Sequence, residues 1–185
     1  MTTEEQKIKV KNFFEKYYEK HEILTILPDV PKEMLAEGED PNEEWQRWKL
    51  IPSTVSDKEI SELENQIGVA FPEILKIFLT TYFHLFDGPV GRHSIDEPFL
   101  AVEEAWNPIL VKAGYLPFTW DEEGYFIRCI DLANMPDEEA CKICQIDHEV
   151  LFDFDEDSEV SREEVEAVMT DVADNFIAYL EGMLD

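Results

Sequence analysis

The chain has 185 residues, with 44% apolar and 12% aromatic side chains. That is enough core material for one folded domain, so the composition excludes an intrinsically disordered chain. The 43 acidic and 15 basic residues give a net charge of −28, which disfavours nucleic acids and anionic membranes as partners and favours basic proteins.

The first predicted element is a helix near residues 3–22, which Thr3 can cap. One face of this helix carries four aromatic residues: Phe13, Phe14, Tyr17 and Tyr18. Residues 23–55 follow with four prolines, which predict an irregular connector. Trp45 and Trp48 stand three residues apart within it, and we expect this pair to pack on the core.

A capping box over residues 56–59 begins the clearest helix, because a serine hydroxyl can accept from the glutamate amide while the glutamate carboxylate reaches back. Gly68 is placed to end that helix with left-handed backbone. Pro72 opens a second helix, which is apolar nearly all round over residues 74–86 and is expected to be the central buried helix. An Asp-Gly pair at residues 87–88 is expected to stop it.

Strand-like runs dominate the second half of the chain. Segments rich in β-branched and aromatic residues predict strands over 99–102, 125–130, 143–146 and 150–154. Residues 121–124 have the composition of a hairpin turn before the second of these strands. A short helix interrupted at Pro108 is expected over residues 103–113.

A second capping box, over residues 161–164, begins a closing helix with an apolar stripe that continues to residue 184. The predicted order is therefore helices, a central antiparallel sheet and a closing helix. This order indicates an α+β fold in which helices wrap the sheet, with an extra helix at the N-terminus.

Three segments together resemble the SUKH superfamily. The first is Ser56–Leu79, with its Ile60 and Leu63 stripe, the glycine, the Phe-Pro turn and the buried helix. The second, Leu116–Asp131, is similar to the family's strand pair, and the third, Val172–Leu180, to its closing helix. The chain departs from the family pattern in the long aromatic run before residues 87–88 and in keeping only one glycine in the hairpin.

The resemblance covers about residues 45–184. It implies residues 45–185 as a SUKH-like domain, used as a binding scaffold, and residues 1–44 as an added helix and connector. Bacterial members are largely immunity proteins that neutralise toxins, often nucleases, and a fungal relative regulates cell-wall synthesis and signalling. Neither role supplies catalytic residues, and we predict that the chain is not an enzyme.

We expect no metal and no cofactor. Residues 153–164 resemble a calcium-binding EF-hand loop, but Ser158 stands where the sharp turn requires glycine, and no second loop pairs with it. Cys129, Cys141, Cys144 and His148 are zinc-type ligands, but a second Cys-x-x-Cys pair is missing. Residues 141 and 144 would also point to opposite faces of a strand.

Catalysis and export have little support in the sequence. The histidines are scattered, and His84, within a predicted apolar helix, is expected to be a hydrogen-bonded core residue rather than a base. The N-terminal residues lack the basic and apolar regions of a signal peptide, and no run of about 18 apolar residues is present to span a membrane. With an odd number of cysteines, the chain is expected to be cytoplasmic.

The acidic residues are the predicted binding surface. Residues 121–185 carry 21 acidic and 3 basic side chains, a net charge of −18. Ten carboxylates in predicted loops are expected to bind the partner: Asp121, Glu122, Glu123, Asp137, Glu138, Glu139, Asp153, Asp155, Glu156 and Asp157. Such a surface can occupy the Lys and Arg side chains that a nuclease presents to phosphates. The alternative is a solvated rim that serves solubility alone.

The sequence therefore predicts an immunity-type protein that binds and blocks a basic toxin, such as a nuclease. A regulatory scaffold in signalling or cell-wall synthesis is the alternative within the same family. A calcium- or zinc-binding protein, or a metal-dependent enzyme, is the alternative from another class.

Overall fold

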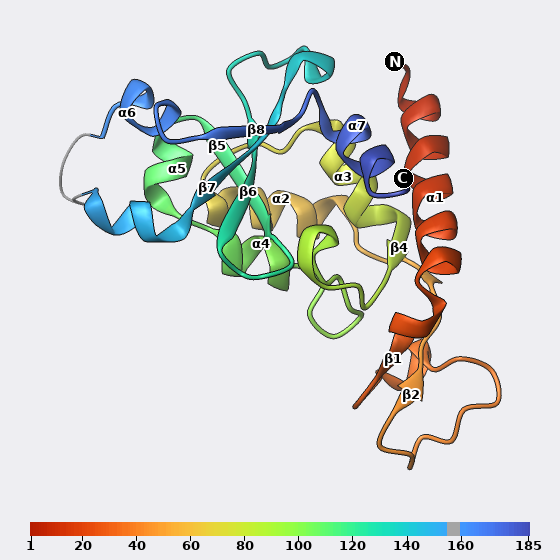
Figure 1. The fold of residues 1–185 in the computed structure, drawn as a ribbon. Coiled ribbons are helices and arrows are strands. Elements are labelled where there is room, and N and C mark those ends of the chain that lie inside the picture. The colour runs from red at the N-terminus through yellow and green to blue at the C-terminus, as the bar shows by residue number, and fades with distance from the viewer. Residues whose placement is uncertain (155–159) are drawn as a thin grey trace.

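The computed structural model describes residues 1–154 and 160–185. A four-stranded antiparallel sheet lies at its centre, with the strands in the order β5–β6–β7–β8 (Figure 1). The strands are β5 (Tyr115–Trp120), β6 (Phe126–Asp131), β7 (Ile143–Asp147) and β8 (Thr170–Ala173). Together with the helices around it, this sheet confirms the predicted α+β fold.

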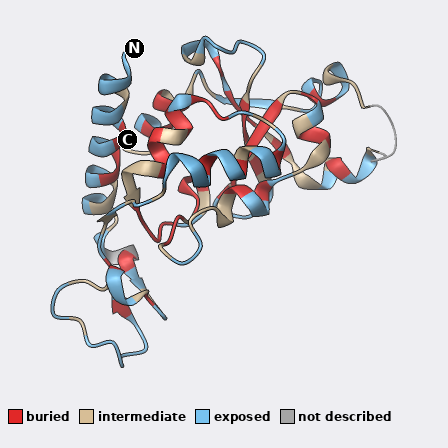
Figure 2. Cartoon of the chain, turned by 180° about the vertical axis from the view of Figure 1, so that it is seen from behind, coloured by how far each residue is buried: buried red, intermediate tan, exposed pale blue. Residues whose placement is uncertain are grey.

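Side chains alternate along the strands between two hydrophobic cores, as the period of two in a strand requires. Leu116, Ile130 and Ile143 belong to the first core, whereas Ile127 and Ile146 belong to the second. Buried positions (red in Figure 2) therefore lie on both faces of the sheet. The helices are α1 (Thr3–Lys20), α2 (Asp57–Ile67), α3 (Glu73–Thr81), α4 (Leu100–Ala105), α5 (Pro108–Lys112), α6 (Arg162–Glu166) and α7 (Phe176–Gly182).

The first core contains buried residues of α1, α2, α3 and α7, and the second contains those of α5 and α6. The 3₁₀ segments are η1 (Glu22–Thr25), η2 (Lys32–Met34), η3 (Gly88–Val90), η4 (Glu138–Ala140) and η5 (His148–Asp153). Among the described residues, no helix combines the length and the apolar character needed to cross a bilayer.

The predicted capping boxes form at residues 56–59 and 161–164, where they begin α2 and α6. Gly68 ends α2 with φ at 91°, a left-handed value that favours glycine. At the first helix the predicted cap is wrong by one residue. Thr2, not Thr3, accepts from the backbone N–H of Glu5, and the Glu5 side chain accepts from the N–H of Thr2.

The N-terminal helix shares the first core. Val10, Phe13 and Phe14 of α1 are buried, and the Phe14 ring lies 4.9 Å from the ring of Phe78 in α3. Lys20 Nζ also donates to the carbonyl of Leu184 at 2.8 Å. Helix α1 thus stands beside α3 and α7 (Figure 1). A domain boundary between residues 44 and 45 stays a prediction.

The connector after α1 is irregular, as its prolines predict, and it contributes three short strands to two strand pairs. Strand β1 (Ile26–Leu27) pairs with β2 (Gln46–Arg47), and β3 (Ile51–Pro52) pairs with β4 (Tyr82–Phe83). The expectation for the two tryptophans is half wrong. Trp48 is completely buried, whereas Trp45 is 58% exposed.

The central buried helix is shorter than predicted, because α3 ends at Thr81 rather than at residue 86. The hydroxyls of Thr80 and Thr81 donate to carbonyls one turn earlier, an arrangement that weakens a helix. The chain then becomes extended and pairs with β3, and His84 forms a bridge with His93. Residues 82–86 are still largely buried, so their apolar pattern reflects burial and not helix.

Three other predicted elements differ from the structure. The closing helix is interrupted by β8, because residues 170–173 pair with β7 and Asn175 then starts α7 by accepting from the N–H of Ala178. Residues 99–102 form the start of α4 instead of a strand. Residues 150–154 fall mainly in η5, where Asp147 accepts from the N–H of Glu149 and tightens the chain into a turn.

Candidate protein-binding surface

The predicted acidic residues lie at opposite ends of the sheet. Residues 121–123 form the turn between β5 and β6, and residues 137–139 lie in the loop between β6 and β7. Figure 1 shows that turn at the lower edge of the sheet and that loop at its upper edge. Asp153, at the end of η5, follows the end of β7 that is nearer the turn. Asp155, Glu156 and Asp157 lie outside the described residues.

Asp121 is a structural residue of the hairpin. Its Oδ1 accepts from the backbone N–H groups of Tyr125 and Phe126 at 2.8 and 2.9 Å. Its exposed fraction is 9%. Because its carboxylate satisfies two backbone donors, it fixes the turn and offers little to a partner.

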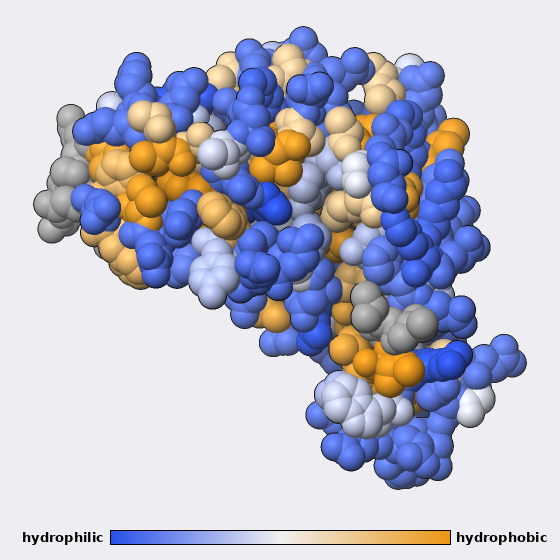
Figure 3. Space-filling model, in the orientation of Figure 1, coloured by the Kyte–Doolittle hydropathy of each residue, from blue (hydrophilic) through white to orange (hydrophobic). Residues whose placement is uncertain are grey.

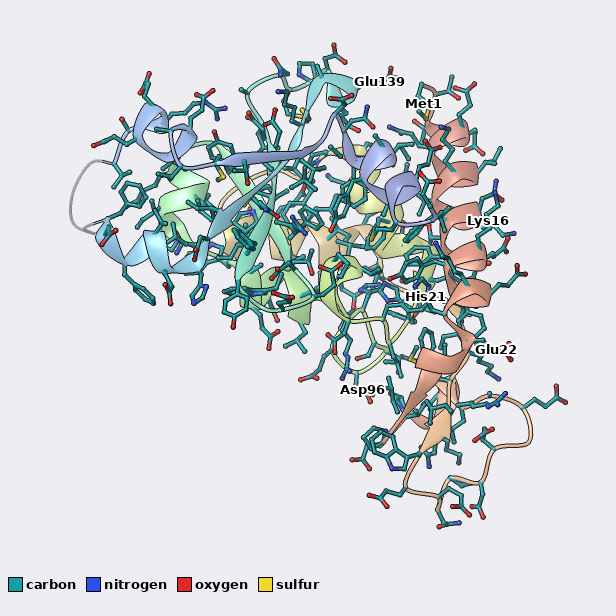
Figure 4. All side chains as sticks on the ribbon, in the orientation of Figure 1. Met1, Lys16, His21, Glu22, Asp96 and Glu139 are labelled. Atoms are coloured by element: carbon teal, nitrogen blue, oxygen red, sulfur yellow. The ribbon has the colours of Figure 1, made fainter. Side chains whose placement is uncertain are left out.

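The loop at the other end uses its carboxylates inside the fold. Glu138 accepts from the backbone N–H groups of Glu73 at 2.5 Å and Ile74 at 3.2 Å, at the start of α3. A helix begins with unpaired N–H groups and a positive dipole end, which a carboxylate satisfies well. Glu139 forms an ion pair with the amino group of Met1, and the two residues lie close together in Figure 4.

Glu122 and Glu123 are exposed and line a hollow of about 560 Å³. Asp87, before η3, and Glu104, in α4, line the same hollow. We call it the acidic groove and define it by these four residues. One cation lines it, Arg92, whose guanidinium lies 3.3 Å from the Asp87 carboxylate. The groove therefore keeps an excess of negative charge, and its volume lies within the range of ligand-binding pockets.

The chain around η3, which lines the groove with Gly88 and Gly91, is tied to the rest of the fold by two hydrogen bonds. Thr119 Oγ1 donates to the carbonyl of Gly88 at 2.9 Å, and the Tyr179 hydroxyl donates to the carbonyl of Pro89 at 2.7 Å. A Cβ at Gly91 would lie 2.7 Å from Thr119 Oγ1 and 2.9 Å from the Cβ of Ala101, and the φ of Gly91 is 76°. Only glycine allows this approach without displacing its neighbours.

Aromatic side chains continue the surface beside the groove. We call Trp120, Tyr125, His148 and Phe152 the aromatic edge. The His148 ring lies 5.7, 6.5 and 6.2 Å from the rings of Trp120, Tyr125 and Phe152. Tyr125 is 55% exposed and Phe152 is 81% exposed.

Two contacts hold this arrangement together. The Trp120 indole lines the groove and donates to the carbonyl of Glu104 at 3.2 Å, so the edge and the groove are contiguous. The backbone N–H of His148 donates to the carbonyl of Tyr125 at 3.1 Å and fixes η5 to the hairpin. Figure 3 shows apolar surface (orange) over α5, α6 and η5. Exposed aromatic residues beside charged groups are typical of protein interfaces.

The cysteines are buried, and the predicted separation of Cys141 from Cys144 is present. Cys129 and Cys144 face each other across β6 and β7 in the second core, whereas Cys141 belongs to the first core. Burial raises the pKa of the Cys144 thiol to about 12, which disfavours the thiolate that zinc binds. Among the residues that the structure describes, no group of three or more Cys, His, Asp or Glu side chains is placed to hold a metal.

The EF-hand resemblance falls partly outside the described residues, since positions 155–159 are not described. Two of its described members have another role. Ser161 and Glu164 hold each other in the capping box that begins α6.

His84 is completely buried, but the expectation that it is hydrogen-bonded within a helix is wrong. It follows β4 in extended chain, and neither ring nitrogen has a hydrogen-bond partner among the described residues. Its ring lies 4.9 Å from that of Phe14 and 5.4 Å from that of Phe86. Burial lowers the pKa of His84 well below its ordinary value, so the ring is neutral.

Sequence reasoning missed part of this surface. The sequence predicts Asp87 only as part of a helix end, Glu104 as part of a short helix, and Phe152 as part of a strand. One available signal was the run Gly88-Pro89-Val90-Gly91, whose glycines permit a close approach of the chain to β5.

A comparison with protein families identifies a match. The model described as SMI1 / KNR4 family (SUKH-1) matches residues 54–182, which is more than half of the chain. The match includes the acidic groove and the aromatic edge and excludes α1. No curated protein matches the chain.

Proposed function

Because the chain belongs to the SMI1/KNR4 family (SUKH-1), we propose that it is an immunity-type protein that neutralises a basic toxin, such as a nuclease. The family as a whole supports an immunity-type or regulatory protein that acts by binding other proteins. The finer assignment concerns the partner. It rests on the surface formed by the acidic groove and the aromatic edge, which we call the hairpin face.

The observation that carries this proposal is the contact between the two parts of the hairpin face. Trp120 belongs to both, so the aromatic edge adjoins the groove that Glu104, Glu122 and Glu123 line. Aromatic rings in a desolvated contact supply most of the binding free energy of a typical interface. The carboxylates around them favour a partner with Lys and Arg at the matching positions.

A nuclease has this charge pattern, because it must bind phosphates with basic side chains. A net charge of −28 would accelerate its encounter with this protein. Covering those side chains with the hairpin face would exclude nucleic acid from them. Inhibition would then need no catalytic group in the inhibitor.

A regulatory scaffold is the second candidate, and one observation favours it. The connector carries another acidic and aromatic surface, in which Trp45 is 58% exposed and follows Glu43 and Glu44. Figure 1 shows this connector, with β1 and β2, extending below α1 and away from the sheet. Two separate surfaces would allow more than one partner.

A pull-down from the source cells tests the proposal, with washes at low and then high salt and identification of bound proteins by mass spectrometry. We expect one basic partner in a stoichiometric complex. Its association rate should fall steeply as salt shortens the Debye length from about 10 Å at 0.1 M to about 3 Å at 1 M. A spread of weakly bound partners would contradict the toxin assignment and favour the scaffold.

A further inference from the structure

We propose that the acidic groove of the hairpin face and an adjoining hollow bind two cationic side chains of one partner segment in two chambers, and that the N-terminal helix builds the second chamber. The acidic groove is the first chamber. This inference rests on the proposed function, because it specifies how the same face would recognise a basic partner. It also assigns a role to residues that precede the family match.

The first chamber combines carboxylates with an aromatic wall. Four exposed acidic residues line it against one arginine: Asp87, Glu104, Glu122 and Glu123. Trp120 forms part of its wall and is held by its hydrogen bond to the carbonyl of Glu104. A guanidinium placed here would meet both an indole and carboxylate oxygens.

The second chamber is a hollow of about 280 Å³ between the end of α1 and the segment around η3. Tyr17, His21 and Leu27 line it from the N-terminal side, and Phe86 from the other. The rings of Tyr17 and His21 are stacked with centroids 4.0 Å apart, and the rings of Tyr17 and Phe86 are perpendicular with centroids 4.8 Å apart. Figure 4 shows His21 at the lower end of α1, where the helix meets the rest of the fold.

A narrow ridge separates the two chambers. Asp87, Gly88 and Glu122 line both of them. A Cβ at Gly88 would lie 3.2 Å from the Cα of Glu122, so the chain around η3 packs directly on the hairpin turn. Burial and then the Glu122 carboxylate raise the pKa of Tyr17, so Glu122 acts electrostatically across the second chamber. The carboxylates of Asp87 and Glu122 can therefore pair with a cation in either chamber.

This chemistry fits arginine. A guanidinium stacks on aromatic faces and pairs with carboxylates through parallel N–H groups, and each chamber offers both kinds of group. Two arginines in one segment bind more tightly than one, because binding of the first arginine raises the effective concentration of the second arginine at its chamber. The excess of carboxylates disfavours the phosphates of nucleic acids and anionic lipids.

Short arginine peptides test the chambers directly. The probes are N-acetyl-arginine amide and a series of peptides in which two arginines are joined by glycine linkers of increasing length. Matched peptides carry neutral citrulline in place of arginine. Binding is measured by calorimetry and by ¹⁵N NMR. We expect shifts at the Trp120 indole and Gly91 for the first chamber, and at His21 and Leu27 for the second.

The best two-arginine peptide should bind about a hundredfold more tightly than the single amino acid, as linkage of two sites predicts. The citrulline peptides should not bind. Shifts spread over the whole acidic surface, or equal affinity for one and two arginines, would overturn the two-chamber inference.

Paired variants identify the residues. Glu122→Gln should weaken the two-arginine peptide about tenfold, since it removes a charge shared by both chambers. Glu163→Gln, on the exposed face of α6, should leave the affinity unchanged. Tyr17→Leu should abolish the shifts at His21, whereas Tyr18→Leu, on the same helix but outside the chamber, should not. Equal effects within either pair would contradict the assignment.

The captured partner distinguishes this inference from the proposed function. Suppose that one basic partner is captured, and that the Glu122→Gln and Tyr17→Leu variants bind it as tightly as the unchanged protein. The two-chamber inference is then contradicted, whereas the proposed immunity function is supported. If no single basic partner is captured but the arginine peptides bind as described, the proposed immunity function is contradicted, whereas the two-chamber inference is supported.

Discussion

Two loops of this protein contain the same tripeptide, Asp-Glu-Glu, at residues 121–123 and 137–139, and the fold uses them in opposite ways. In the hairpin turn the aspartate holds the backbone, and both glutamates remain exposed around the acidic groove. In the other loop Glu138 caps α3, and Glu139 pairs with the amino group of Met1.

The difference arises from what each loop meets in three dimensions. Residues 137–139 lie next to the first turn of α3 and the start of α1, which both present positively polarised N–H or amino groups. Residues 122–123 meet other carboxylates, those of Asp87 and Glu104. Identical local sequences thus stabilise the fold at one end of the sheet and remain available for a partner at the other end.

Charge reversal in each loop should give the largest effect, and it tests whether the two loops differ in partner binding. Glu122→Lys with Glu123→Lys should slow association with the captured basic partner about a hundredfold at low salt, because the steering field at the groove changes sign. The matched change, Asp137→Lys with Glu139→Lys, alters the net charge equally. It should slow association only severalfold, as measured by stopped-flow fluorescence. Equal rates for the two pairs would mean that only net charge matters.

The pH dependence of the free energy of unfolding tests a further aspect of this comparison. We expect that two buried histidines, and neither Asp-Glu-Glu tripeptide, cause the loss of stability near pH 5. Burial lowers the pKa of His93 from 6.5 to about 4, and it also lowers the pKa of His84 well below 6.5. The rings around them are those of Phe14, Phe78, Phe83, Phe86 and Phe99, and His93 Nδ1 also contacts the carbonyl of Pro98. Between pH 6.5 and 4 the unfolded chain therefore binds protons that the folded chain does not.

Stability should be fully present above pH 6.5, and His93 alone should remove about 2 kcal/mol of it by pH 5. Urea unfolding at a series of pH values measures this loss. His84→Phe should make the profile shallower over that range, whereas His148→Phe, at the partly exposed aromatic edge, should not. An unchanged profile in His84→Phe would show that other groups cause the acid sensitivity.

Removing one glutamate from each loop should give the smallest of the three effects. Glu138→Ala should lower the free energy of unfolding by about 1 kcal/mol, as expected for the loss of a helix cap. Glu123→Ala should change it by less than about 0.5 kcal/mol, as for other exposed positions. Urea unfolding of both variants at pH 7 checks this, and a larger loss for Glu123→Ala would reverse the assigned roles.

Features that depend on neighbouring residues could be predicted from the sequence. The capping boxes at Ser56 and Ser161 need only a glutamate three residues later, and the strands at residues 125–130 and 143–146 need only their own side chains. Features that depend on distant groups could not. The end of α3 at Thr81 is set largely by pairing with β3, and β8 forms because β7 offers a free edge.

The same distinction holds for the candidate site. The acidity of residues 121–123 is visible in the sequence, but the groove also needs Asp87 and Glu104, which come from two other segments. Tyr17 was recognised as part of an aromatic helix face. Its position against Phe86 follows only from the way α1 packs on the fold.

The tight fit of Gly91 against Thr119 and Ala101 bears on how such a surface could diversify. Gly91 cannot be replaced without displacing its neighbours. Exposed residues such as Glu104 and Glu123 in the groove and Tyr125 in the aromatic edge can be exchanged with little cost to folding. The binding specificity of the hairpin face could therefore change through substitution of these exposed residues while Gly91 is kept. Variant libraries designed for new specificities should randomise those exposed positions and keep Gly91 unchanged.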